Sequence, residues 1–397
     1  YTEVDTLSLH DALPILKAVV CHHGDFAVQD VPEPEPGKGQ ILLNVLRCGI
    51  CGSDLHARHH ADELAEATER VGYPHIMRSH EHVVLGHEFV GEIADYGPKT
   101  HRRWKSGKRV VAMPMRRNNG MAHLTGLSTQ APGAYAERVL VEESLAFPVT
   151  NGISDDHAAL TEPMAVSLHA VNRSGIGRRD TAIVIGCGPI GLGVIAMLKA
   201  RGVRHIVASD LSPTRRKLAR AMGAHVVVDP SQGSPYEGME KRGFIVNAPQ
   251  LFDMALDGMA MLRMTPLPWE PLWRAAEVAG VTNPKRPVIF ECVGIPGMIE
   301  SIVADAPLRS CIVVVGVCMK QDHFFPVNAI NKEIDLRFTL GYMPIEFRDA
   351  LHMIAEGKVN VGPMITGTVG LFGVDDAFTA LGNPEQHAKI LIDPGKA

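Results

Sequence analysis

Hydrophobic positions follow two different patterns along the chain, and the change between them divides it. From about Ile15 to Val149, short runs rich in β-branched residues are separated by glycine and proline, as in QILLNVLRC and KRVVAMPM. Runs of this kind predict short strands, so this half should be mostly β and barrel-like. From about residue 166, continuous apolar runs alternate with helical segments, which predicts a parallel sheet covered by helices on both faces.

The second pattern has a limited extent. Residues 231–286 are too long for an ordinary connection and hold two helix-like pieces, so we interpret them as an insertion. After about residue 335 the pattern becomes mixed again, with a helical EFRDALHMIAEG and a terminal strand in AKILID. The helix-like pieces of the insertion are 251–264 and 273–279. We therefore predict an α/β protein with a first domain at 16–165, a second at 166–335, and a return to the first at 336–397.

Composition and charge narrow the class of partner. The 397 residues are 46% hydrophobic and 21% charged, which fits a soluble protein of two or three domains. A net charge of −5 provides no basic field, so we expect neither nucleic acid nor membrane as a partner. Glycines and Pro189 interrupt the longest uncharged run, 181–198, which predicts a strand, a turn and a helix instead of a membrane span.

The cysteines and the amino-terminal residues bear on location. Seven scattered cysteines show no disulfide framework and suit a reducing cytosol. Residues 1–15 lack the positive charge of a secretory signal and resemble adapter-derived sequence. We expect this extension to be poorly ordered and without function, and the protein to be cytoplasmic.

A glycine motif indicates a dinucleotide site. IGCGPIG places three glycines at G-x-G-x-x-G spacing between a predicted strand and a predicted helix, whose N-terminus favours a pyrophosphate. Asp210 ends the next strand, 19 residues past Gly191, where a carboxylate can bind a ribose 2′-hydroxyl. The alternative is a glycine-rich turn that binds no nucleotide. The predicted cofactor residues are Gly186, Gly188, Pro189, Ile190, Gly191, Asp210 and Arg215.

Asp210 also predicts NAD over NADP, because the 2′-phosphate of NADP would bring about two negative charges close to the carboxylate. Arg215 and Arg216 act against this preference, since both begin the following helix and could reach a 2′-phosphate. We expect them to flank the adenine or the solvent instead.

Several metal-ligand residue types occur in the first half. Cys48 and Cys51 form a C-x-x-C that could be a redox dithiol, half of a structural zinc site, or two thiols with unrelated roles. A redox dithiol would need a thioredoxin-like βαβ setting, which the β-rich pattern does not supply. His87, Glu88 and Glu162 are further candidates. Each has an ordinary alternative, namely a buried thiol, a surface pair or a helix-capping charge.

Taken together, these segments resemble the zinc-dependent medium-chain dehydrogenase/reductase family over about residues 16–394. The resemblance rests on CGICGSDLH, GHEFVGEI, GAYAERV, TEPMAVSLHA, IGCGPIGLGVIAMLKARG and ASDLSPTRRKLARAMGA. It implies a GroES-like catalytic domain, a Rossmann domain with a doubly wound parallel sheet, and oxidation of alcohols with NAD(P). The glutamate in TEP makes the chain more similar to the sorbitol and threonine dehydrogenase branches.

The resemblance implies one catalytic zinc. Cys51, His87 and Glu162 would be its ligands, with Glu88 beside the metal as an alternating or neighbouring ligand, and Cys48 would be only a packed neighbour. The family's structural zinc needs four closely spaced cysteines after GKRVVAM, a segment that contains none here, so we expect no structural zinc. A homodimer or homotetramer is also implied.

The expected mechanism uses zinc as a Lewis acid on the alcohol oxygen while hydride leaves for nicotinamide. Ser53 would pass the hydroxyl proton through the cofactor ribose to His56, which titrates near neutrality and releases it to water. A turn hydroxyl and a surface histidine are the alternatives. Asp54 is expected to support the site, and Glu88 to act beside the metal.

The chain departs from the family pattern in the length of one segment. Between Cys51 and His87 lie 35 residues, more than we expect from the family, and besides His56 they include His59, His60, His75, His80 and His82. Solvated histidines on a helix and loop are favoured over an extra metal site, and the segment could line the substrate cleft or form a lid.

The predicted function is a zinc-dependent oxidoreductase that transfers hydride between a small alcohol or polyol and NAD. The rivals are a zinc-free quinone or enoyl reductase and a structural protein of the lens-crystallin kind.

Overall fold

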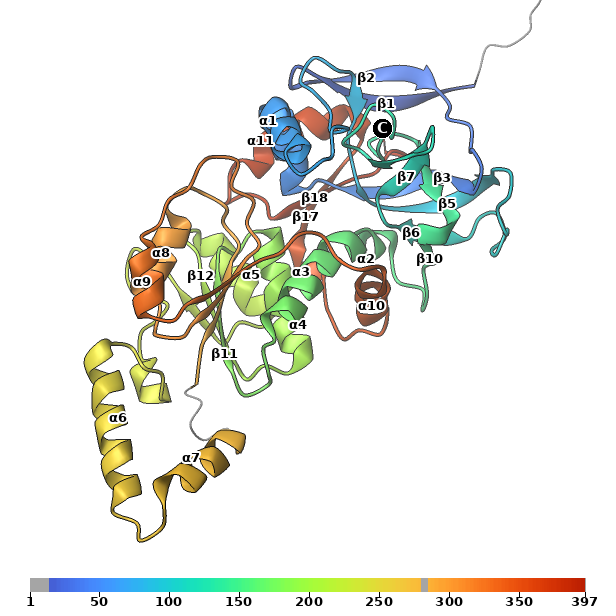
Figure 1. Cartoon of the computed structure of the whole chain (residues 1–397). Helices are drawn as coiled ribbons and strands as arrows, with labels where there is room; N and C mark the ends of the chain where they lie inside the picture. Colours follow the sequence, from blue (N-terminus) through green and yellow to red (C-terminus); the bar gives the residue numbers. More distant parts are fainter. Residues whose placement is uncertain (1–13, 280–284, 397) are drawn as a thin grey trace, which may run out of the picture. The chain divides into compact units, whose positions relative to one another are not determined.

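The chain forms two compact units, seen in a computed structural model that describes residues 14–279 and 285–396 (Figure 1). The first unit comprises the described residues up to Glu162 together with Gly367–Gly382 and the residues from Lys389 onward. The second comprises Pro163–Thr366 and Asn383–Ala388. Residues 1–13, where we expected a poorly ordered extension, lie outside the described residues.

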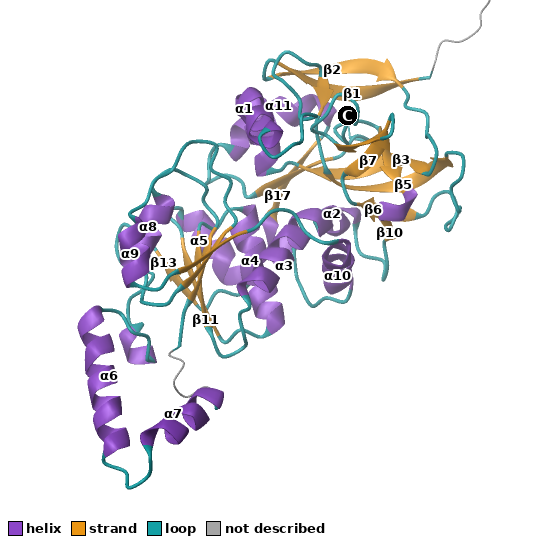
Figure 2. Ribbon diagram, viewed as in Figure 1, coloured by secondary structure: helices purple, strands orange, loops and turns teal. Residues whose placement is uncertain are grey.

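The first unit is mostly β, as its short apolar runs predict (Figure 2). Its larger sheet has the order β10-β6-β5-β3-β18-β17, with β9 also paired to β3, and a smaller sheet has the order β2-β1-β4. The strands are β1 (Ile15–His22), β2 (Asp25–Pro32), β3 (Gln40–Gly49), β4 (Val83–Val84), β5 (Glu88–Tyr96), β6 (Arg109–Ala112), β9 (Arg138–Glu142), β10 (Ala146–Pro148), β17 (Ile365–Val369) and β18 (Lys389–Ile392). A separate hairpin joins β7 (Met115–Asn118) to β8 (Met121–Leu124). The helices are α1 (Gly52–Glu69), α2 (Asp155–Ala159) and α11 (Val374–Leu381).

Strand β3 is the centre of the first unit. Most of its side chains are buried, because it lies between β5 and β18 and its apolar positions fill the core. The antiparallel register pairs Gly49 with Glu88 of β5 and with Leu391 of β18. This pairing brings the end of β3, the beginning of β5 and the beginning of β18 to one place, although they are far apart in the sequence.

The second unit is built on the predicted parallel sheet. Its strand order is β13-β12-β11-β14-β15-β16, the doubly wound order of dinucleotide-binding domains. The strands are β11 (Thr181–Ile185), β12 (His205–Ser209), β13 (Val226–Val228), β14 (Val288–Glu291), β15 (Cys311–Val314) and β16 (Asp335–Phe338). The helices are α3 (Thr161–Ser174), α4 (Pro189–Arg201), α5 (Pro213–Met222), α6 (Ala248–Arg263), α7 (Trp269–Val278), α8 (Met298–Asp305), α9 (Pro326–Asn331) and α10 (Pro344–Ala355). Helix α3 begins two residues before the unit itself.

The second unit extends beyond the domain limit expected from the sequence. We expected the return to the first domain near residue 336, but the second unit continues to Thr366. Strand β16 pairs in parallel with β15, which makes it the last strand of this sheet, and the side chains of α10 pack as part of the same unit. The mixed pattern after residue 335 therefore does not mark the boundary between the compact units.

The inserted segment contains the helices α6 and α7. Figure 1 shows both reaching away from the parallel sheet, and neither helix has a buried residue. The two helix-like pieces of the sequence correspond to them, although each helix begins three or four residues earlier than expected. None of the helices among the described residues combines the length and the apolar character needed to cross a bilayer.

Candidate active site and cofactor site

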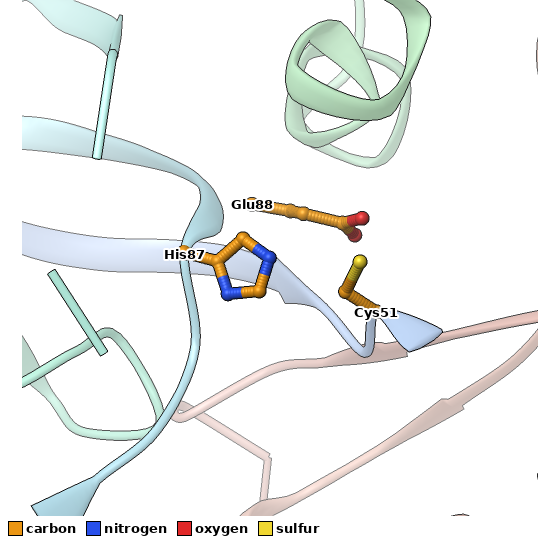
Figure 3. A group of neighbouring side chains, drawn as sticks. All are labelled: Cys51, His87 and Glu88. Atoms are coloured by element: carbon orange, nitrogen blue, oxygen red, sulfur yellow. The ribbon is translucent and has the colours of Figure 1, made fainter. Parts of the chain in front are cut away.

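Three possible metal ligands meet in the first unit: Cys51, His87 and Glu88. Cys51 lies immediately after β3 and precedes α1, whereas Glu88 begins β5 and His87 comes just before it. The pairing of β3 with β5 thus places the two segments together. One donor atom from each residue lies within 4.8 Å of the other two. The sulfur, the carboxylate and one ring nitrogen point toward one another (Figure 3).

Asp54 lies beside these three residues and contacts two of them, Cys51 and His87. Its Oδ2 accepts hydrogen bonds from the Cys51 amide at 2.9 Å and from the Tyr135 hydroxyl at 2.7 Å, and its Oδ1 lies 3.2 Å from His87 Nδ1. Burial would raise the pKa of Asp54, but the charge and contact of His87 outweigh it and lower that pKa. A carboxylate on one imidazole nitrogen fixes the ring so that the other nitrogen can face a metal.

Lys389 belongs to the same cluster, although it was not among the site residues predicted from the sequence. It begins β18, its side chain is 1% exposed, and its Nζ forms an ion pair with Glu88 Oε2 and donates to the Ile50 carbonyl at 2.8 Å. Burial would lower the pKa of Lys389, but the charges of Glu88, Cys51 and Glu162 outweigh burial and raise it. The available signal was a lysine inside the apolar strand AKILI.

Glu162 is buried but is not part of the group formed by Cys51, His87 and Glu88. It lies in the first turn of α3, and its charge reaches Lys389. The carboxylate that the structure brings to the sulfur and the imidazole is therefore Glu88. Cys48 is fully buried in β3, and its thiol donates to the neighbouring Gly49 carbonyl at 3.7 Å, which suits a packed neighbour.

The donor set fits zinc. Zinc is bound in proteins by thiolate, imidazole and carboxylate groups, and catalytic sites keep one position open. Glu88 Oε1 is buried and has no hydrogen-bond partner among the described residues, a costly state for a carboxylate oxygen that a cation would relieve. Cys51, His87 and Glu88 can therefore hold a single zinc ion, with Asp54 orienting the histidine.

Ser53 and His56, the two predicted relay residues, both lie on α1. Ser53 Oγ is 3.1 Å from His87 Nε2, beside the candidate metal ligands. His56 is half-buried further along the helix, and burial first, then the neighbouring His60 and His59, lower its pKa. Among the described residues no hydrogen bond joins Ser53 directly to His56.

The glycine motif has the geometry that a pyrophosphate requires. Gly186 follows β11 with φ +89°, and a Cβ there would lie 3.0 Å from the Cys292 backbone. A Cβ on Gly191 would lie 1.9 Å from the Gly186 carbonyl oxygen, so the close approach of helix and turn excludes any side chain. Gly188 faces open space and caps α4, which begins with Pro189 and Ile190.

Asp210 lies directly after β12, beside this turn. Its carboxylate accepts hydrogen bonds from the amides of Cys187 at 2.7 Å and Ser212 at 2.8 Å. Arg216 donates to the Asp210 carbonyl at 2.8 Å and pairs with Asp229 at 3.1 Å, so its guanidinium holds the backbone in place. We expected Arg216 to flank the adenine or the solvent. Its guanidinium instead contacts the Asp210 carbonyl and Asp229.

A cavity of about 720 Å³ opens over the turn, entirely within the second unit. Asp210, Arg215, Tyr236 and Glu385 are among its lining residues. The Tyr236 hydroxyl is buried without a hydrogen-bond partner among the described residues, and it comes from the part of the inserted segment that precedes α6. Tyr236 and Glu385 both lie outside the motifs from which the cofactor site was predicted.

Comparison with known proteins shows the family that both parts of the chain resemble. The alcohol dehydrogenase GroES-like domain family matches residues 37–151, and the zinc-binding dehydrogenase family matches residues 189–260. An (R,R)-butanediol dehydrogenase from Bacillus subtilis is 30% identical over 390 residues, covering 96% of this chain and 100% of the relative. An erythritol/L-threitol dehydrogenase from Mycolicibacterium smegmatis is 36% identical over 231 residues, covering 54% of this chain and 62% of the relative.

A solved structure extends the likeness to the fold. A protein from Sinorhizobium meliloti, described as a zinc-binding dehydrogenase bound to NADP, is 25% identical with a TM-score of 0.73, covering 96% of this chain and 100% of its own. The chain thus belongs to the zinc-dependent medium-chain dehydrogenase/reductase family. It is an alcohol dehydrogenase that uses zinc and a nicotinamide cofactor, which confirms the predicted family, fold class and type of reaction.

We predict that Cys51→Ser removes most of the bound zinc and at least about 99% of the activity, because a hydroxyl is a much poorer zinc ligand than a thiolate. Elemental analysis of purified protein should give one zinc per wild-type chain. Cys48→Ser is the matched control, three residues earlier, and should keep its zinc. A Cys51→Ser protein with full zinc content and full turnover would contradict the assignment.

Proposed function

We propose that the protein oxidises a secondary alcohol carrying a neighbouring hydroxyl group, a vicinal diol or polyol, with NAD as the preferred cofactor. The grouping of Cys51, His87 and Glu88 is the observation that carries the proposal, because a zinc-free reductase or a structural protein has no use for it. Two named relatives act on such compounds, a butanediol in one and a tetritol in the other. Glu162 is proposed as the additional carboxylate ligand implied by the resemblance.

Each residue of the site has a distinct task in the proposed reaction. When bound, zinc supplies the Lewis acidity that lets an alcohol lose its proton near neutral pH, and NAD accepts the hydride. Cys51, His87 and Glu88 hold the metal. Ser53 Oγ, beside His87, would accept the hydroxyl proton while giving up its own, which would pass through the cofactor ribose to His56 for release to water.

The preference for NAD is supported by Asp210 and by the contacts of the neighbouring arginine. Asp210 lines the cavity, whereas the Arg216 guanidinium donates to backbone carbonyls and pairs with Asp229. Two unit charges about 4 Å apart interact by roughly 1 kcal/mol in water and about 4 kcal/mol near a protein surface. Wild-type kcat/KM should accordingly be ten- to several-hundredfold higher with NAD than with NADP, as roughly 1.4 kcal/mol corresponds to a factor of ten.

We also propose that the protein is cytoplasmic and forms a homodimer or homotetramer. The seven scattered cysteines, all free among the described residues, support a reducing compartment. The oligomer rests on the family resemblance.

A panel of alcohols followed at the nicotinamide absorbance tests the function. Vicinal diols and polyols of three to six carbons should be oxidised with higher kcat/KM than primary alcohols or isolated secondary alcohols of equal length. Matched pairs such as 2,3-butanediol and 2-butanol isolate the contribution of the second hydroxyl group. Reduction of quinones or enones without any alcohol oxidation would favour the zinc-free reductase, and no turnover of any kind would favour a structural role.

We predict that His56→Ala lowers alcohol oxidation by roughly a hundredfold if proton release limits the rate. A neutral imidazole must accept the proton, and burial together with His60 and His59 lowers the pKa of His56, so the wild type should stay active to a pH below the ordinary histidine range.

His60→Ala removes one of these charges, raises the pKa of His56, and should move the acidic limb of kcat/KM to higher pH.

The control for these variants is His352→Ala, on the surface of the second unit, which should leave the profile unchanged. A His56→Ala enzyme with the wild-type pH profile would show that His56 takes no part in proton release.

A further inference from the structure

Glu385, near the C-terminal end of the sequence, lines the cofactor cavity. It belongs to the short segment Asn383–Ala388, which is part of the second unit, and it lines the same cavity as Asp210. Its Oε2 accepts a hydrogen bond from the Thr214 amide at 3.4 Å, and the adjacent Pro384 carbonyl accepts one from Ser212 Oγ at 3.4 Å. The segment is thus held against the beginning of α5.

The beginning of α5 is where an anion next to the adenosine ribose would bind. Free amides at a helix N-terminus attract phosphate groups. Here the amides are already engaged: Ser212 Oγ accepts from the Arg215 amide at 3.0 Å, Glu385 accepts from Thr214, and Pro213 has no amide hydrogen. A carboxylate from the protein therefore occupies the position that an external anion would take.

The charges around the cavity act in the same direction. Asp210, Glu385 and Asp305 line it, with Arg215 as the positively charged lining residue. Hydrogen bonds from the Ser212 side chain and from Thr214 lower the pKa of Glu385, so its carboxylate is ionised at neutral pH. The cavity suits the neutral hydroxyl groups of a ribose better than a phosphate with about two negative charges.

We propose that Glu385 is a second specificity-determining residue, whose carboxylate at the beginning of α5 acts with Asp210 to exclude the 2′-phosphate of NADP. The inference rests on the proposed preference for NAD and assigns part of it to a residue outside the glycine motif and its following strands. Asp210 binds the ribose hydroxyl groups, whereas Glu385 takes the amide that a 2′-phosphate would need.

Calorimetric titration tests this without turnover. The ligands are NAD, NADP, 5′-AMP and 2′,5′-ADP; the last two differ only in the 2′-phosphate. The proteins are the wild type, Glu385→Gln and Asp210→Ser. Glu385→Gln should tighten NADP and 2′,5′-ADP by about tenfold, because it removes one charge, and leave NAD and 5′-AMP within about twofold. Asp210→Ser should also weaken NAD, since it removes the acceptor of the ribose hydroxyl groups.

The matched control is Glu300→Gln, an exposed carboxylate on α8 between cavity-lining residues that does not itself line the cavity. It changes the net charge equally and should alter no affinity by more than about twofold, so a local effect is separated from a general one. Thermal unfolding verifies that each variant folds.

The outcomes separate the two claims. Equal wild-type affinities for NAD and NADP would refute the proposed NAD preference, and with it the role of Glu385. A wild type that prefers NAD, together with a folded Glu385→Gln whose affinity for 2′,5′-ADP matches that of Glu300→Gln, would refute the role of Glu385 alone.

Discussion

The burial of four ionisable side chains side by side in the first unit is the constraint on which the site depends. Asp54, His87, Glu88 and Lys389 are all at least about nine-tenths buried. Burying charges is costly unless they are paired, and here Asp54 faces His87 while Lys389 faces Glu88. The two pairs leave the Cys51 sulfur, one imidazole nitrogen and one Glu88 carboxylate oxygen within 4.8 Å of one another, a donor set that a divalent cation completes.

Backbone constraints play the corresponding part in the second unit. The turn after β11 lies so close to α4 that position 191 has no room for a side chain. Gly188, at the beginning of the helix, leaves space for a pyrophosphate. The next helix is different, because Ser212 and Glu385 already occupy its first amides. One helix N-terminus is therefore available to a phosphate, and the neighbouring one is closed by the protein's own carboxylate.

The features that depend on a local pattern of residues could be predicted from the sequence. The strand, turn and helix around Gly186 and the residue types at Cys51 and His87 are visible in short segments, and the family resemblance placed them in one site. Lys389 and Glu385 were missed because their roles arise from pairing and packing across about 170 to 340 residues, which no local period records. The length of the second unit likewise depends on a contact between distant segments, since β16 is defined by its pairing with β15.

X-ray absorption at the zinc edge of the purified protein tests the central claim most directly, because it reads the ligands of the metal without reference to substrate. A single catalytic zinc on Cys51, His87 and a carboxylate predicts one sulfur at about 2.3 Å and the remaining ligands as nitrogen or oxygen at about 2.0–2.2 Å. The single sulfur should disappear in Cys51→Ser reloaded with zinc. Zinc surrounded by two or more sulfurs, or by none, would contradict the site derived from these residues.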